Sequence, residues 1–245
     1  MTPTPVGMRC PDCSRERTRV TRITAASASA LPVVTVSLIA INVVVFLVAA
    51  LTGGGLASGG AGPLMYNGQL YGPSVSANGE YWRLVTSGFL HAGFFHLLMN
   101  MIFIWILGSM LEPALGRLRF LTLYIVCLLC GSLGALLIEP NVPVVGASGA
   151  AFGLLGAAIV MARRRGIDIW GSGLAPILML NLVVTFLVPG IAIGAHVGGV
   201  LGGFLAGFVM EEVGERHGSN AAAGAAAVIG VVAVVLSLAV AGSNI

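Results

Sequence analysis

Seven stretches of nearly uninterrupted apolar residues constrain this chain more than any other feature. They lie near 32–52, 94–112, 117–138, 147–163, 172–189, 194–211 and 221–242. A helix needs about 20 residues to cross the ~30 Å hydrocarbon core of a bilayer. Because 57% of the residues are hydrophobic and 9% are charged, one soluble core could not bury this surface. The pattern therefore predicts an all-α, polytopic membrane bundle of seven helices.

The positive charges predict the orientation of this bundle, since arginine gathers in the cytosolic loops of membrane proteins. Five arginines lie within residues 1–30, which places the N-terminus in the cytosol, and Arg83 alone falls on the outer side. The net charge of +3 is thus a topology signal and gives no indication of nucleic-acid binding. The remaining arginines all fall in cytosolic loops: Arg117, Arg119, Arg163, Arg164, Arg165 and Arg216.

The polar N-terminal segment, residues 1–30, contains Cys10 and Cys13 in a CxxC arrangement that could supply half of a zinc site. The other two cysteines, Cys127 and Cys130, lie in an apolar segment where buried thiols usually only pack. We favour a disordered cytosolic tail over a metal knuckle completed by another chain. We expect no cofactor and no structural disulfide.

The outer connection between the first two segments, about 53–94, is much longer than a hairpin requires. It is rich in glycine and then in aromatic residues of the kind that settle at a membrane interface. We expect a functional loop lying partly in the outer leaflet, with an ordinary exposed loop as the alternative. The aromatic residues are Tyr66, Tyr71, Tyr81 and Trp82.

Two candidate reactive residues fall at the same predicted depth. Ser148 begins the fourth segment and His196 begins the sixth, and both segments descend from the outer face. Small residues recur at spacings that let the two helices approach closely. Those residues are Gly149, Gly153, Gly194, Gly198, Gly199, Gly202, Gly203 and Gly207.

This pair has the chemistry of a Ser-His dyad, because an imidazole can take the serine proton and later return it to a leaving amine. His96 and Asn100, four residues apart on one face of the second segment, are candidate donors to an oxyanion, with the backbone N–H of Ser148. No triad is expected. The acidic residues at or near segment ends, none evidently level with His196, are Glu112, Glu139, Glu211 and Glu212.

Each of these candidate site residues could instead have a purely structural role. A serine in a membrane helix commonly bonds its own backbone, and an intramembrane histidine or asparagine can simply join two helices. The shared depth and the full set of roles favour function.

These residues together resemble the motifs of the rhomboid intramembrane serine proteases of the bacterial type, over roughly residues 32–212. The matching pieces are Tyr81-Trp82-Arg83, His91, His96 to Asn100, Gly146-Ala147-Ser148-Gly149 and Gly194 to Gly199. The N-terminal stretch with Cys10 and Cys13 also resembles the end of a Cys-rich module of some actinobacterial rhomboids.

The resemblance implies that Ser148 is the nucleophile, His196 the general base, and His96 with Asn100 the oxyanion hole. It implies a six-helix core over 31–212, followed by a linker and a seventh helix over 213–245. It also implies a cell-membrane location, a site open to the outer face, and lipid-embedded single-span proteins as substrates, admitted by the fifth helix and the loop after it. The supporting residues that it implies are Gly146, Gly149, Trp82, Arg83, His91, Glu112 and Gly199.

Two other classes remain as alternatives. A catalytically silent relative acting as a chaperone or adaptor would normally have lost Ser148 or His196. A small transporter would need polar residues at the midplane of several helices. We therefore expect a serine endopeptidase.

Overall fold

The computed structural model describes residues 2–4, 7–9, 31–55 and 62–243. The chain forms two compact units, Met1–Ala30 and Leu31–Ile245. In the first, β1 (Thr2–Thr4) pairs antiparallel with β2 (Gly7–Arg9). This hairpin was not predicted, because three-residue strands are too short to show a period. Cys10 and Cys13, the half zinc site considered above, lie outside the described residues.

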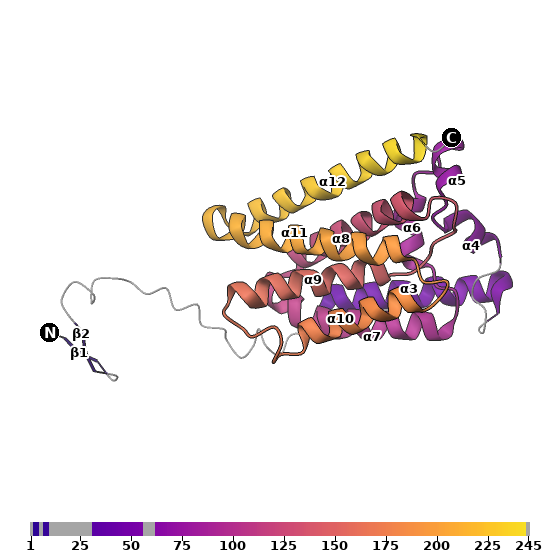
Figure 1. Cartoon of the computed structure of the whole chain (residues 1–245). Helices are drawn as coiled ribbons and strands as arrows, with labels where there is room; N and C mark the ends of the chain where they lie inside the picture. Colours follow the sequence, from indigo (N-terminus) through magenta and orange to yellow (C-terminus); the bar gives the residue numbers. More distant parts are fainter. Residues whose placement is uncertain (1, 5–6, 10–30, 56–61, 244–245) are drawn as a thin grey trace. The chain divides into compact units, whose positions relative to one another are not determined.

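In the second unit, seven long helices coincide with the seven apolar segments. Figure 1 shows them running alongside one another as a bundle, which confirms the all-α fold. Five are long and apolar enough to cross a membrane, whereas α9 and α10 are shorter, at 17 and 14 residues. The helices are α3 (Val33–Ala49), α7 (Phe94–Leu115), α8 (Arg117–Ile138), α9 (Ser148–Arg164), α10 (Leu174–Leu187), α11 (Ile193–His217) and α12 (Ser219–Ser243).

Single glycines separate two consecutive pairs of helices. Gly116 lies between α7 and α8 with φ of 82°, and Gly218 lies between α11 and α12 with φ of 86°. Such positive φ values favour glycine, which lacks the Cβ that would strain them. Each pair therefore forms a tight hairpin.

The centre of the bundle is α9, most of whose residues are buried, with α8 and α11 packed against it. The glycines of α11 bring backbones together: a Cβ on Gly198 would lie 2.9 Å from the Cα of Gly134 in α8. On the α9 side, a Cβ on Gly156 would lie 2.7 Å from the carbonyl oxygen of Val200. The predicted close approach of these helices is present. Helix α12 lies along α8 and α11 (Figure 1).

The long connection before α7 is largely helical. It forms α4 (Pro63–Gly68), α5 (Gly72–Ala77), α6 (Arg83–Thr86) and the short 3-10 helix η2 (Ser87–Phe89), after the π-helical η1 (Ala50–Gly54) that extends α3. Arg83, 2% exposed, holds these pieces together. Its Nη1 donates to the carbonyl oxygens of Tyr66 at 2.8 Å and Gln69 at 2.7 Å, and its Nε donates to Glu80 at 2.5 Å.

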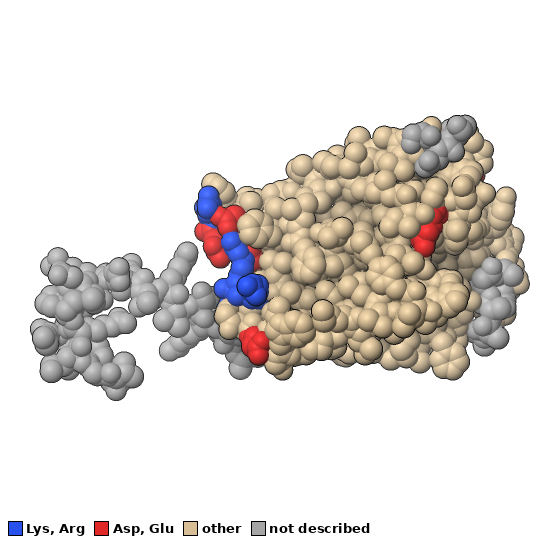
Figure 2. All heavy atoms as spheres, in the orientation of Figure 1, with Lys and Arg blue, Asp and Glu red and all other residues tan. Residues whose placement is uncertain are grey.

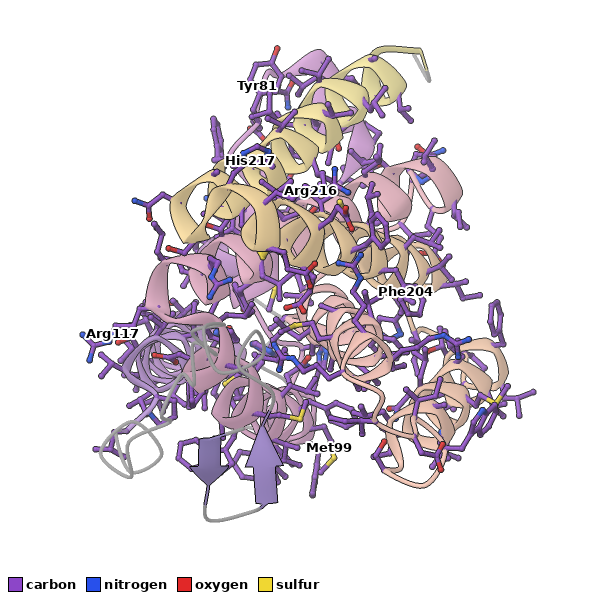
Figure 3. All side chains as sticks on the ribbon, turned by 90° about the vertical axis from the view of Figure 1, so that its left-hand side faces the viewer. Tyr81, Met99, Arg117, Phe204, Arg216 and His217 are labelled. Carbon is purple, nitrogen blue, oxygen red and sulfur yellow. The ribbon has the colours of Figure 1, made fainter. Side chains whose placement is uncertain are left out.

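Most of the charged side chains of the bundle gather at one end. Figure 2 shows the visible basic side chains together at the end where α11 turns into α12. Figure 3 views the molecule from that end, with Arg117, Arg216 and His217 labelled. Here Arg164 pairs with Glu212, and Arg165 lies 3.3 Å from Glu211. The opposite end carries α4, α5 and α6 (Figure 1).

Candidate active site

Ser148 is the first residue of α9, and the chain before it is fastened to the preceding loop. Val144 and Leu70 exchange two backbone hydrogen bonds, of 2.8 and 2.9 Å. The N–H of Gly146 donates to the carbonyl of Ser87 at 2.9 Å. These bonds fix where α9 begins and therefore where the Ser148 side chain stands.

The structure brings Ser148 and His196 together. Nε2 of His196 lies 2.8 Å from Oγ of Ser148, although the two residues are 48 positions apart. The ring of Phe152, one turn beyond Ser148 on α9, stacks on the imidazole with centroids 4.0 Å apart and planes 16° apart. This stacking restricts the tilt of the imidazole, which is 8% exposed.

The other imidazole nitrogen has a partner that sequence reasoning missed. Nδ1 of His196 lies 2.7 Å from Oγ1 of Thr185 on α10. The sequence does contain a signal for it: Asn181 and Thr185 are four residues apart in an otherwise apolar helix, and polar residues within a membrane segment are commonly functional. Glu139 lies near this site but its Oε1 accepts the N–H of Ile193, at 3.1 Å.

His96 and Asn100 both face the same cavity as the Ser148–His196 pair. Nδ1 of His96 accepts the N–H of Ala92 at 3.4 Å. The Asn100 amide donates to the carbonyl of His96 at 2.8 Å. Gly146, with φ of 126°, makes room for His96, because a Cβ there would lie 2.7 Å from its Nε2.

The cavity has a volume of about 870 Å³. Its walls come from α7, α9, α10, α11 and the segments before α9 and α11. Most of the lining side chains are apolar. The polar ones are His96, Asn100, Glu139, Ser148, Asn181, Thr185 and His196.

The other predicted site residues surround or support this cavity. His91, 1% exposed, meets the edge of His96 with ring centroids 5.2 Å apart. Burial, with a smaller contribution from His96, lowers the pKa of His91 to about 3. Trp82 is 53% exposed, and its Nε1 donates to the carbonyl of Asn67 at 3.1 Å.

Glu112 lies far from this cavity along α7. It follows His96 by sixteen residues, which is about 24 Å of helix. Its carboxylate instead accepts the N–H groups of Val34 and Thr35 and the Thr35 hydroxyl. Within the described residues, no group of three or more His, Cys, Asp or Glu side chains is placed to hold a metal ion.

Comparison with known proteins gives several relatives. The chain is 37% identical over 121 residues to Rhomboid protease GluP of Bacillus subtilis, covering 48% of this chain and 24% of that protein. It is 41% identical over 93 residues to Rhomboid-like protease 3 of Toxoplasma gondii, covering 38% of this chain and 35% of that protein. It is 32% identical over 125 residues to Inactive RHOMBOID-like protein 8 of Arabidopsis thaliana, covering 51% of this chain and 35% of that protein.

The chain thus spans less than half the length of these relatives, and one of them is named as inactive. Their three source organisms do not single out a bacterial type. A family model described as the Rhomboid domain matches residues 78–213, from the end of α5 into α11, and α12 follows the matched region as an additional helix. Because this match covers more than half of the sequence, the chain belongs to the rhomboid family.

Proposed function

We propose that this protein is a serine endopeptidase that cuts transmembrane segments of single-span membrane proteins near their outer ends. The observation that carries the proposal is the 2.8 Å contact between Oγ of Ser148 and Nε2 of His196 inside a helical membrane bundle. A hydroxyl at this distance can pass its proton to an unprotonated imidazole nitrogen.

The reaction follows from this geometry. His196 Nε2 takes the proton as Ser148 Oγ bonds to the carbonyl carbon of the substrate, giving a tetrahedral oxyanion. When the C–N bond breaks, Nε2 returns the proton to the leaving amine, and an acyl ester remains on Ser148. Water, deprotonated by the same nitrogen, attacks this ester; its breakdown releases the acid and restores the Ser148 hydroxyl.

Three groups could donate to the oxyanion. Because Nδ1 of His96 accepts the N–H of Ala92, Nε2 carries the hydrogen and can donate into the cavity. The Asn100 amide has a second N–H beyond the one bonded to the His96 carbonyl. The backbone N–H of Ser148 is in the first turn of α9, where no intrahelical acceptor exists.

The cavity and the charge distribution support the substrate class and the side of the membrane. Apolar walls around a few polar groups suit an apolar segment whose backbone must reach Ser148. The basic residues Arg163, Arg164 and Arg165 are at the far end of α9 from Ser148. If that end faces the cytosol, the candidate site opens toward the outer face.

The test is cleavage of a model single-span substrate by the purified protein in liposomes. We expect Ser148→Ala and His196→Ala each to lower the rate by at least roughly 10³-fold. Ser237→Ala is the matched control and should leave the rate unchanged, because among the described residues the Ser237 hydroxyl bonds the Ala233 carbonyl of its own helix, α12. Labelling of the parent by a fluorophosphonate should disappear in Ser148→Ala.

Equal cleavage by the parent and Ser148→Ala would overturn the mechanism. Absence of both cleavage and labelling in the parent would favour the alternative of a silent family member.

A further inference from the structure

Helix α10 presents both of its polar residues, Asn181 and Thr185, to the candidate site, together with Val184. Thr185 is 2% exposed, whereas its neighbours Phe186 and Leu187 are 60% and 74% exposed. Asn181 and Thr185, one helical turn apart, both line the cavity that contains Ser148. The buried hydroxyl of Thr185 therefore lies inside the site while most of α10 faces outward.

The hydrogen-bond partners of Thr185 fix the position of its single hydrogen. Oγ1 lies 2.8 Å from the backbone carbonyl oxygen of Asn181 and 2.7 Å from Nδ1 of His196. A carbonyl oxygen can only accept, so the hydroxyl hydrogen is directed to Asn181. Oγ1 must then accept, which requires that Nδ1 of His196 carries a hydrogen.

The other imidazole nitrogen is specified by the same constraint. A neutral imidazole has one N–H, so with Nδ1 protonated its Nε2 has a free lone pair. That nitrogen is the one 2.8 Å from Oγ of Ser148. The chain of bonds thus runs from the Ser148 hydroxyl through the imidazole and Thr185 to the Asn181 carbonyl.

From this chain of bonds we infer that Thr185 is a positioning residue of the site, holding His196 in the tautomer and rotation that let Nε2 take the Ser148 proton. The inference rests on the proposed peptidase function. Phe152 restrains the tilt of the ring by stacking, and Thr185 restrains rotation within the ring plane. The hydroxyl takes the place that a carboxylate occupies in soluble triads, without placing a second charge in an apolar bundle.

Thr185 also has a role once the proton has moved. When His196 is an imidazolium, its Nδ1–H bond to Thr185 becomes charge-assisted and stronger. Glu139 and Asn181 also line the cavity, but in the described part of the chain neither is hydrogen-bonded to His196: Oε1 of Glu139 accepts from Ile193, and the Asn181 amide donates to the Ile177 carbonyl at 2.8 Å. Thr185 therefore stabilises the charge that forms during the reaction.

The matched variants are Thr185→Val, which keeps the shape and removes the hydroxyl, and Thr185→Ser, which keeps the hydroxyl. We expect Thr185→Val to lower kcat roughly 10- to 100-fold, the size of losing a hydrogen bond to a charged group. KM should stay within about twofold, because the bond strengthens in the transition state rather than on binding. Thr185→Ser should keep kcat within about threefold of the parent.

A second measurement reports the tautomer without any turnover. Nitrogen-15 NMR of histidine-labelled protein, with the His196 signals assigned by His196→Gln, should show Nδ1–H in the parent and in Thr185→Ser. Thr185→Val should show a mixture of tautomers. If Thr185→Val does not fold, Thr185→Ala removes the hydroxyl without added bulk and gives the same comparison.

Unchanged kcat and an unchanged tautomer in Thr185→Val would overturn the inference, as would equal losses in the valine and serine variants. Failure of the proposed function would look different, because the parent itself would neither cleave nor label. The NMR comparison would still decide whether Thr185 sets the tautomer of His196.

Discussion

Gly199 of α11 and Gly149 of α9 touch backbone to backbone. A Cβ on Gly199 would overlap with the carbonyl oxygen of Gly149 and lie 2.8 Å from its carbonyl carbon. Gly149 directly follows Ser148, and Gly199 is three residues beyond His196. The absence of a side chain on Gly199 therefore lets α9 and α11 approach closely beside the candidate nucleophile and its base.

Gly199→Ala should push α9 and α11 apart, since backbone atoms at the contact cannot rotate away. We expect a loss of roughly 1–3 kcal/mol in unfolding free energy and slower fluorophosphonate labelling of Ser148. Gly224→Ala in α12 is the control, because no heavy atom lies within 4 Å of its added Cβ. Thermal denaturation in detergent measures the first effect. A Gly199→Ala protein with parental stability and labelling rate would contradict this account.

The helices could be predicted from the sequence because their signal is local. The length and apolarity of each segment indicate a helix, and the arginines predict its orientation across the membrane. These two signals were enough to predict the same depth for Ser148 and His196. The contact between α10 and α11 was not predictable in the same way. The spacing of Asn181 and Thr185 marks a polar face on α10, but the residue that this face meets depends on how α10 is rotated against α11, which no local period encodes.

The connection before α7 shows a second limit of sequence reasoning. Its short helices α4, α5 and α6 carry few periodic residues, and Arg83 ties them through the carbonyls of Tyr66 and Gln69. These are tertiary bonds between a side chain and distant backbone. The sequence predicted a long aromatic loop, but the short helices within it and the Arg83 bonds that join them could be identified only from the structure.

Arg83→Lys should loosen this connection while preserving its charge. A lysine ammonium lacks the planar fork that bonds Glu80 and two carbonyls at once. We expect a loss of roughly 1.5–3 kcal/mol in local stability, seen as faster limited proteolysis within residues 62–86. Arg216→Lys is the control, because Arg216 pairs with Glu212 with 70% of its side chain exposed. Equal digestion of both variants would refute the assigned role.

Glu112→Gln should weaken the attachment of α3 to α7. The carboxylate oxygens accept three hydrogen bonds, from the backbone N–H groups of Val34 and Thr35 and from the Thr35 hydroxyl, at 2.8–2.9 Å. An amide would turn an NH₂ toward these donors, at an expected loss of about 1–3 kcal/mol in unfolding free energy. Thr35→Val, which removes one donor, should lose less.

Chemical denaturation in detergent would rank these two variants against Glu215→Gln, which changes an exposed carboxylate in α11. If Glu112→Gln lost no more unfolding free energy than Glu215→Gln, the hydrogen bonds of Glu112 to Val34 and Thr35 would not be what attaches α3 to α7.

His91 should make the protein less stable in mild acid. Its folded pKa, lowered to about 3 by burial, lies below the ordinary histidine value of 6.5. Between these two pH values the unfolded state binds a proton that the folded state does not. The stabilisation is therefore fully present above pH 6.5 and is lost as pH falls toward 3, by up to about 1.4 kcal/mol per pH unit.

Denaturation curves collected between pH 7 and pH 4 measure this slope. His91→Gln cannot titrate, so it should flatten the slope even if its stability at pH 7 is lower. His217→Gln, at an exposed histidine of α11, is the control variant for the loss of a histidine as such. Parallel curves for His91→Gln and the parent would show that the acid sensitivity comes from other groups, because a buried neutral imidazole predicts a difference that grows with every unit of pH below 6.5.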